Sequence, residues 1–129
     1  MIAVDIQQKL GAFALQTKFE APAGVTAIFG PSGSGKTSVV NAVAGLNRPD
    51  AGRIAVGDVV LFDSATRINI PAHKRRIGYV FQDARLFPHM TVLQNLRYGG
   101  QHDEALLIAV LGLEDLLRRM PTGLSGGER

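Results

Sequence analysis

A glycine-rich loop that follows an apolar run constrains this chain more than any other feature of its sequence. The run is Val25-Thr26-Ala27-Ile28-Phe29, and the loop reads Gly30-Pro31-Ser32-Gly33-Ser34-Gly35-Lys36-Thr37. Its spacing is glycine, four residues, then glycine, lysine and serine or threonine. After the loop, apolar residues recur at helical spacing as far as Leu46. The order predicts a strand buried on both faces at 25–29, then a loop, then a helix over about 36–46.

The loop has the chemistry of a polyphosphate site. Glycines let the backbone curl until successive N–H groups point inward as an anion-binding nest, and the following helix adds its positive N-terminal end. The Lys36 ammonium can reach the β- and γ-phosphates, and the Thr37 hydroxyl can ligate Mg²⁺. We therefore predict that ATP and Mg²⁺ are bound by Gly30, Pro31, Ser32, Gly33, Ser34, Gly35, Lys36, Thr37 and Ser38.

Period-two patterns predict short strands on either side of this loop. Residues 2–6 and 11–19 form two strands around a polar turn, and residues 53–56 and 59–62 read as a hairpin around Gly57-Asp58. A further short strand is expected at 77–81. One face of the second strand carries Phe13, Leu15, Thr17 and Phe19.

The last third of the chain has a helical pattern. Apolar residues recur at helical spacing from Thr91 to Leu117, until Pro121-Thr122-Gly123 breaks the pattern. Ser125 and Glu128 then have the spacing of a capping box, which predicts the start of a new helix.

Composition and charge exclude several classes of function. The chain is 46% hydrophobic and 19% charged, as in a globular protein, and it has no cysteine for disulfides or thiolate metal sites. His73, His89 and His102 lack the spacing of metal ligands. No segment approaches the roughly 18 apolar residues of a membrane span.

The net charge of +3 is unevenly spread along the chain. Residues 67–97 contain one acid, Asp83, and six basic residues: Arg67, Lys74, Arg75, Arg76, Arg85 and Arg97. These basic residues are scattered and lack interleaved aromatics. We interpret them as a solvated face and expect no nucleic-acid binding.

A second glycine motif, Leu124-Ser125-Gly126-Gly127-Glu128, narrows the class of phosphate-binding protein. Two adjacent glycines in the first turn of a helix cost up to about 1 kcal/mol each in helix propensity, so a helix cap does not explain them. Close approach of the backbone to a phosphate explains these two glycines. The motif, and the order of phosphate loop, Gln82 and motif, resemble the ABC ATPase family. The resemblance runs through nearly the whole chain.

The resemblance implies an α/β fold, namely a P-loop NTPase fold of ABC type. An antiparallel β part and the P-loop core would occupy residues 1–82, and the start of a helical subdomain would occupy 83–129. Gln82 matches the family's Q-loop, which contacts Mg²⁺ or the attacking water. Phe13 is the nearest candidate for an aromatic that stacks on adenine, although a core position on its strand explains it equally well.

The resemblance also implies partners. Two subunits would form a homodimer in which each signature motif, through Ser125, Gly126 and Gly127, touches the ATP held by the other subunit. Residues 75–92 are similar to importer subunits for small oxyanions, and Asp83-Ala84-Arg85 and residues 95–99 are most similar to molybdate importers. Residues 85–88 would then lie near a transmembrane permease. The chain would be peripheral, on the cytoplasmic face of the inner membrane, and would couple ATP hydrolysis to transport.

In the family, a strand ending in Asp-Glu and a later histidine follow the signature and complete hydrolysis. This sequence has neither, so we expect an N-terminal fragment without the C-terminal half of the core. With strand 25–29 at an open edge, the fragment alone is expected to fold poorly or to associate. Two alternatives stay open. One is a non-transport ABC ATPase of the DNA-repair type, whose usual long insertions this chain lacks, and the other is a non-catalytic truncated remnant.

Overall fold

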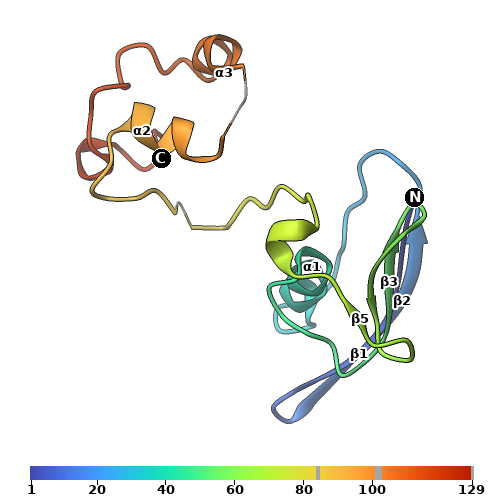
Figure 1. The fold of residues 1–129 in the computed structure, drawn as a ribbon. Coiled ribbons are helices and arrows are strands. Elements are labelled where there is room, and N and C mark those ends of the chain that lie inside the picture. The colour runs from blue at the N-terminus through green and yellow to red at the C-terminus, as the bar shows by residue number, and fades with distance from the viewer. Residues whose placement is uncertain (84, 101–102, 129) are drawn as a thin grey trace. The chain divides into compact units, whose positions relative to one another are not determined.

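The computed structural model describes residues 1–83, 85–100 and 103–128 (Figure 1). Sequence predictions that concern Ala84, His102 and Arg129 lie outside these residues. The chain divides into two compact units, Met1–Tyr79 and Val80–Arg129, and each is described by itself.

The first unit contains a five-stranded antiparallel sheet in the order β2-β1-β3-β4-β5. Its strands are β1 (Ile2–Leu10), β2 (Phe13–Ala21), β3 (Ala51–Val56), β4 (Val59–Asp63) and β5 (Ile68–Asn69). β1 pairs with β2 along its whole length, from Ile2↔Ala21 to Leu10↔Phe13, and with β3 on its other side. Both hairpins predicted from the sequence are confirmed; β1, β3 and β4 are longer than expected, and β2 begins and ends two residues later than expected.

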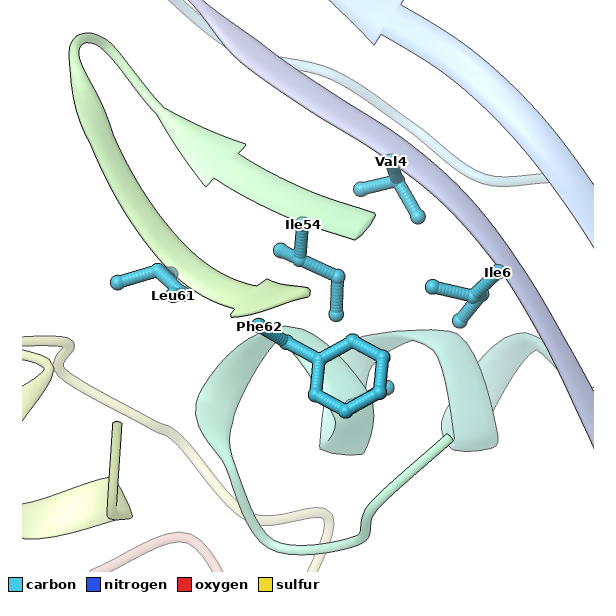
Figure 2. Packing of buried hydrophobic residues seen from close by; sticks show 6 residues of the cluster. Val4, Ile6, Ile54, Leu61 and Phe62 are labelled. Carbon is cyan, nitrogen blue, oxygen red and sulfur yellow. The ribbon is translucent and has the colours of Figure 1, made fainter. Parts of the chain in front are cut away.

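Helix α1 (Lys36–Ala44) packs on one face of this sheet (Figure 2). Period-two alternation turns Val4 and Ile6 of β1 inward, where they meet Ile54 of β3. The other buried members of the cluster are Leu61, Phe62 and Ala42. Burial of each large apolar side chain contributes about 1.5–3 kcal/mol. This core therefore fixes the helix that follows the glycine-rich loop.

The predicted helix over 36–46 is confirmed, with its last turn ending two residues early. Gly45 adopts the left-handed conformation with a φ of 80° and donates its N–H to the Ala42 carbonyl, while the Leu46 N–H bonds to the Asn41 carbonyl. Such a glycine at the end of a helix satisfies carbonyls that have no partner within it. α1 is followed by a loop that leads into β3.

Two predicted strands are wrong for this structure. Residues 25–29 and 77–81 have no regular structure, and Phe29 is 92% exposed while Val25 and Val80 are almost fully exposed. A strand that is apolar on both faces is stable only between neighbouring strands and beneath covering helices. The described sheet pairs neither segment, so the apolar pattern has no partner to complete it.

The second unit contains α2 (Val92–Tyr98) and α3 (Glu104–Leu111), which confirm part of the helical prediction. Thr91 and Gln94 form a complete capping box at the start of α2. The expected continuation through residues 113–117 is wrong, because Gly112 ends α3 with a φ of 62° and the leucines that follow lie in turns. Short 3-10 helices lie at η1 (Ala72–Lys74) in the first unit and η2 (Pro121–Gly123) in the second.

Candidate phosphate-binding site

The glycine-rich loop curls directly into the first turn of α1. Gly33 and Gly35 have φ values of 79° and 88°, in the left-handed region that favours glycine. The Ser34 N–H donates to the Pro31 carbonyl at 3.3 Å and closes a turn within the loop. Gly35 is the N-cap residue of α1, so the loop leads straight to the helix's free N–H groups.

A side chain at either of two of these glycines would crowd a neighbouring side chain. A Cβ atom on Gly30 would lie 2.8 Å from the Ser34 hydroxyl oxygen, and one on Gly35 would lie 2.8 Å from a methyl carbon of Leu15. Both distances are shorter than van der Waals contact. A side chain at 30 or 35 would therefore require Ser34 or Leu15 to move, and at 35 the positive φ also favours glycine.

The Lys36 ammonium lies against the loop that precedes it. Its Nζ donates to the Gly30 carbonyl at 2.8 Å, to the Pro31 carbonyl at 2.7 Å and to the Ser34 hydroxyl at 3.5 Å. All three acceptors are neutral oxygens, so these contacts hold the cation in place without cancelling its charge. The arrangement places a full positive charge beside the curl of main-chain amides.

The first turn of α1 adds to this positive character. It contains no acidic residue that would compete with an anion for the helix N-terminus. Thr37 is exposed on this turn, as a ligand for an incoming ion must be. Ser38 is half-buried, and its carbonyl accepts a hydrogen bond from the Asn47 side chain at 3.2 Å.

Phe13 lies beside the loop. One carbon of its ring is 3.5 Å from the position that a Cβ atom on Gly35 would occupy, and the residue is 45% exposed. Leu15, two residues along the same strand, is buried as the alternation predicts. A purely core position does not account for Phe13, so an exposed aromatic surface adjoins the phosphate loop.

The remaining predicted site residues belong to the second unit. Gln82 is exposed, as are Ser125, Gly126 and Gly127. The predicted helix start at Ser125 is wrong within the described residues, because 126–128 form a turn closed by the Glu128 N–H and the Ser125 carbonyl at 3.2 Å. Half of the capping box is present, since the Ser125 N–H donates to a Glu128 carboxylate oxygen at 2.6 Å.

These contacts also shift the ionisation of Glu128. Hydrogen bonds from the Ser125 hydroxyl and the Ser125 N–H lower the pKa of the Glu128 carboxyl, with a smaller contribution from the charge of Arg119. The carboxylate is therefore the favoured form in this turn, which spans Gly126 and Gly127.

Asn95 of α2 organises the segment that we expected near a permease. Its side chain accepts from the Phe87 N–H at 2.7 Å and donates to the carbonyls of Met90 and Thr91 at 3.1 Å each. Phe87 in turn packs on Tyr98 with ring centroids 4.4 Å apart. Nearby, the Arg85 guanidinium lies 4.5 Å from the centre of the Phe81 ring.

The interpretation of the basic residues at 67–97 as a solvated face is wrong for Arg75. This arginine is 6% exposed and donates four hydrogen bonds, two of them to carbonyls near the end of α1. Nothing in its own neighbourhood of the sequence marks it as buried. The only signal is indirect, because α1 has no basic residue in its last turn to balance its C-terminal carbonyls.

The chain is similar to proteins of one known family along nearly its whole length. A family model described as "ABC transporter" matches residues 16–129. The chain is 54% identical to the "molybdenum import ATP-binding protein ModC" of Pectobacterium atrosepticum, with 100% of this chain and 38% of that protein covered. It is 50% identical to the protein of the same name in Photobacterium profundum, over 99% of this chain and 37% of that protein. The corresponding protein of Rhodospirillum rubrum is 51% identical, with 100% and 37% covered.

The chain therefore spans well under half the length of these curated relatives. Among the residues that the structure describes, no helix is both long enough and apolar enough to cross a membrane.

Proposed function

This chain belongs to the ABC transporter family, and on that premise we propose that it binds the polyphosphate of ATP at residues 30–37. We further propose that it is part of the ATP-binding subunit of an importer for molybdate or a similar oxyanion. The relatives that carry the name of a molybdenum import ATP-binding protein support the solute, and the loop geometry supports the nucleotide.

The observation that carries this proposal is the juxtaposition of the Lys36 ammonium with the curled loop at the start of α1. Phosphate oxygens would accept from the loop's main-chain N–H groups, while Lys36 would exchange its neutral partners for the β- and γ-phosphates. Charge-assisted hydrogen bonds of this kind are about twice as strong as neutral ones. Phe13, exposed beside Gly35, would offer its ring to the adenine.

Mg²⁺ would neutralise part of the charge on the β- and γ-phosphates. The exposed Thr37 hydroxyl, on the first turn of α1, fits the oxygen chemistry that this ion prefers. Gln82 is the proposed second contact, to the ion or to the attacking water. In this role Gln82 would take part in hydrolysis, and Thr37 would position the ion.

The signature motif would act on a second subunit. Ser125, Gly126 and Gly127 are exposed, and the two glycines present bare backbone that a phosphate can approach. We propose that they contact the ATP held by the partner in a homodimer. A membrane permease is the proposed second partner, which would place the protein on the cytoplasmic face of the inner membrane.

The test is a calorimetric titration of Mg-ATP into three proteins: the unmodified protein, the Lys36→Ala variant and the Lys9→Ala variant. Lys36→Ala removes charge-assisted hydrogen bonds, so its affinity should fall about 10- to 100-fold. Lys9 is exposed on β1 and serves as the matched control, with unchanged affinity expected. An unchanged affinity in Lys36→Ala would overturn the assignment of the phosphate site.

The dimer is tested by Ser125→Arg. This variant should bind ATP normally and fail to dimerise with it, because the bulky cation occupies the approach to the partner's phosphate. Size-exclusion chromatography with Mg-ATP reports the result. A normal ATP-dependent dimer would reject the proposed role of the signature motif.

A further inference from the structure

Arg75 closes the end of α1 that is opposite the phosphate-binding loop. Its Nη1 atom donates to the Ala42 carbonyl at 2.7 Å and to the Val43 carbonyl at 2.9 Å. Its Nε donates to the Ile70 carbonyl at 2.6 Å, and its Nη2 donates to the Asn69 side chain at 3.1 Å. One guanidinium thus joins the last turn of the helix to β5 and the residue that follows it.

Helix α1 supplies no cation of its own at this end. Its last turn contains no basic residue and its first turn no acidic one, so its own sequence does nothing to balance its dipole. Arg75 comes from more than 30 positions further along the chain and supplies the missing positive charge at the C-terminal carbonyls. Planar, forked donors suit this task, because a single group can satisfy carbonyls from two segments at once.

The site is built for a guanidinium. A Cβ atom on Gly45 would lie 2.6 Å from the Arg75 Nε and 2.9 Å from its Cζ, so the glycine leaves the space that the side chain fills. Burial lowers the pKa of Arg75, yet a guanidinium keeps its charge at neutral pH. Its four acceptors are all neutral oxygens, so it forms no ion pair through them, and its charge is directed at the helix end.

We propose that Arg75 is a positioning residue for the phosphate-binding loop, acting through α1. The loop is continuous with the first turn of the helix, whereas Arg75 fixes the last turn against the sheet. α1 is only nine residues long, about 13 Å at a rise of about 1.5 Å per residue, so a tilt that begins at its last turn also moves its first turn. Any tilt would displace the Gly35 and Lys36 backbone relative to Phe13 and Leu15 of β2. This inference rests on the proposed polyphosphate site.

The experiment compares two substitutions of Arg75 in the protein as it is encoded. Arg75→Met removes the positive charge and the hydrogen-bond donors but keeps a long, unbranched side chain. Arg75→Lys keeps the charge but loses the planar, forked arrangement of donors. Ile54→Val is the control, because it weakens the same core by removing one methyl group without touching α1's carbonyls. The thermal midpoint of each variant is measured first, and the affinities for Mg-ATP and inorganic triphosphate are then measured at a temperature well below that midpoint.

We expect both affinities to fall about tenfold in Arg75→Met and by less in Arg75→Lys. Ile54→Val should lower the thermal midpoint and leave both affinities unchanged. A folded Arg75→Met variant that binds triphosphate like the parent would overturn the proposal. If Arg75→Met does not fold, the same comparison is made with Arg75→Lys, and if neither variant folds, the positioning role is rejected in favour of a purely structural one.

The Lys36→Ala titration separates this inference from the proposed function. If Lys36→Ala lowers ATP affinity and Arg75→Met does not, only the role of Arg75 fails. If neither substitution changes it, the phosphate site itself is wrong.

Discussion

β4 and the segment at residues 25–29 are both short, apolar and rich in β-forming side chains, but their surroundings differ completely. β4 lies between β3 and β5 with α1 over one face, and its Phe62 is 1% exposed. The segment at 25–29 pairs with no strand of the described sheet, and its phenylalanine is in solvent. The difference shows that an apolar sequence favours a β-strand but is not sufficient for one. The strand forms only where a neighbouring strand pairs with its backbone N–H and carbonyl groups.

We expect the largest difference between the two regions when a phenylalanine side chain is removed from each. Phe62→Ala should lower the free energy of unfolding by about 3–5 kcal/mol, because it leaves a cavity in the core. Phe29→Ala should change it by less than about 0.5 kcal/mol, as for an exposed residue. Urea denaturation of both variants measures the difference. Equal losses would mean that residues 25–29 are packed in the protein.

A second pair of variants tests how closely the backbones of β1 and β3 approach each other. Gly52 and Gly24 have similar φ values of 112° and 121°, but a Cβ atom on Gly52 would clash with the Asp5 carbonyl oxygen, whereas one on Gly24 meets nothing within 4 Å. Both alanine variants carry the strain of a positive φ. Gly52→Ala should therefore be less stable than Gly24→Ala by about 1–3 kcal/mol of added overpacking. Equal stabilities would show that β1 and β3 are not so closely paired.

The second unit contains a complete capping box at Thr91 and Gln94 and a half-formed one at Ser125 and Glu128. Thr91→Ala removes the side chain that accepts the Gln94 N–H at the start of α2 and should cost about 1 kcal/mol. Thr122→Ala, at an exposed position, is the control, with a change below about 0.5 kcal/mol. Helix content by circular dichroism checks both variants. Loss of helix in the control alone would reject the cap.

The smallest expected effect is the pH dependence of the turn at residues 125–128. The pKa of Glu128 is lower in this turn than in an unfolded chain, so the carboxylate stabilises the turn above its ordinary pKa of 4.5. That stabilisation is lost as the pH falls through the lowered value. The amide proton of Ser125, followed by NMR, should titrate with a midpoint below 4.5, and Glu128→Gln should abolish the titration. A midpoint at or above 4.5 would contradict the hydrogen bonds seen here.

Local patterns were sufficient for much of this fold. Alternation along residues 2–21 and 53–62 predicted both hairpins because each strand finds its partner a few residues away. The helix after Lys36 was also predictable, since its apolar face and its terminal glycine are local signals. Strands at 25–29 and 77–81 were predicted wrongly because their stability depends on partners that the local pattern does not specify.

The candidate site also has a part that local sequence predicts and a part that it does not. The spacing of Gly30 to Thr37 indicates the curled loop that the structure contains. The place of Phe13 beside Gly35 was not predictable in this way, because it depends on how the loop packs against β2. Burial of Arg75 was not predictable from its neighbours, because its four acceptors come from the end of α1 and from residues 69–70. A basic residue without an acidic partner is predicted to be exposed, unless the helix end whose carbonyls it binds is already known.

The central claim, that main-chain amides and Lys36 hold a polyphosphate, is tested most directly by NMR of the backbone amides as inorganic triphosphate is added. The account predicts that the resonances of residues 32–37 shift together and saturate, with much weaker shifts in Lys36→Ala. Adenosine alone should leave these resonances in place. Saturable triphosphate shifts located elsewhere, or none at all, would contradict the account.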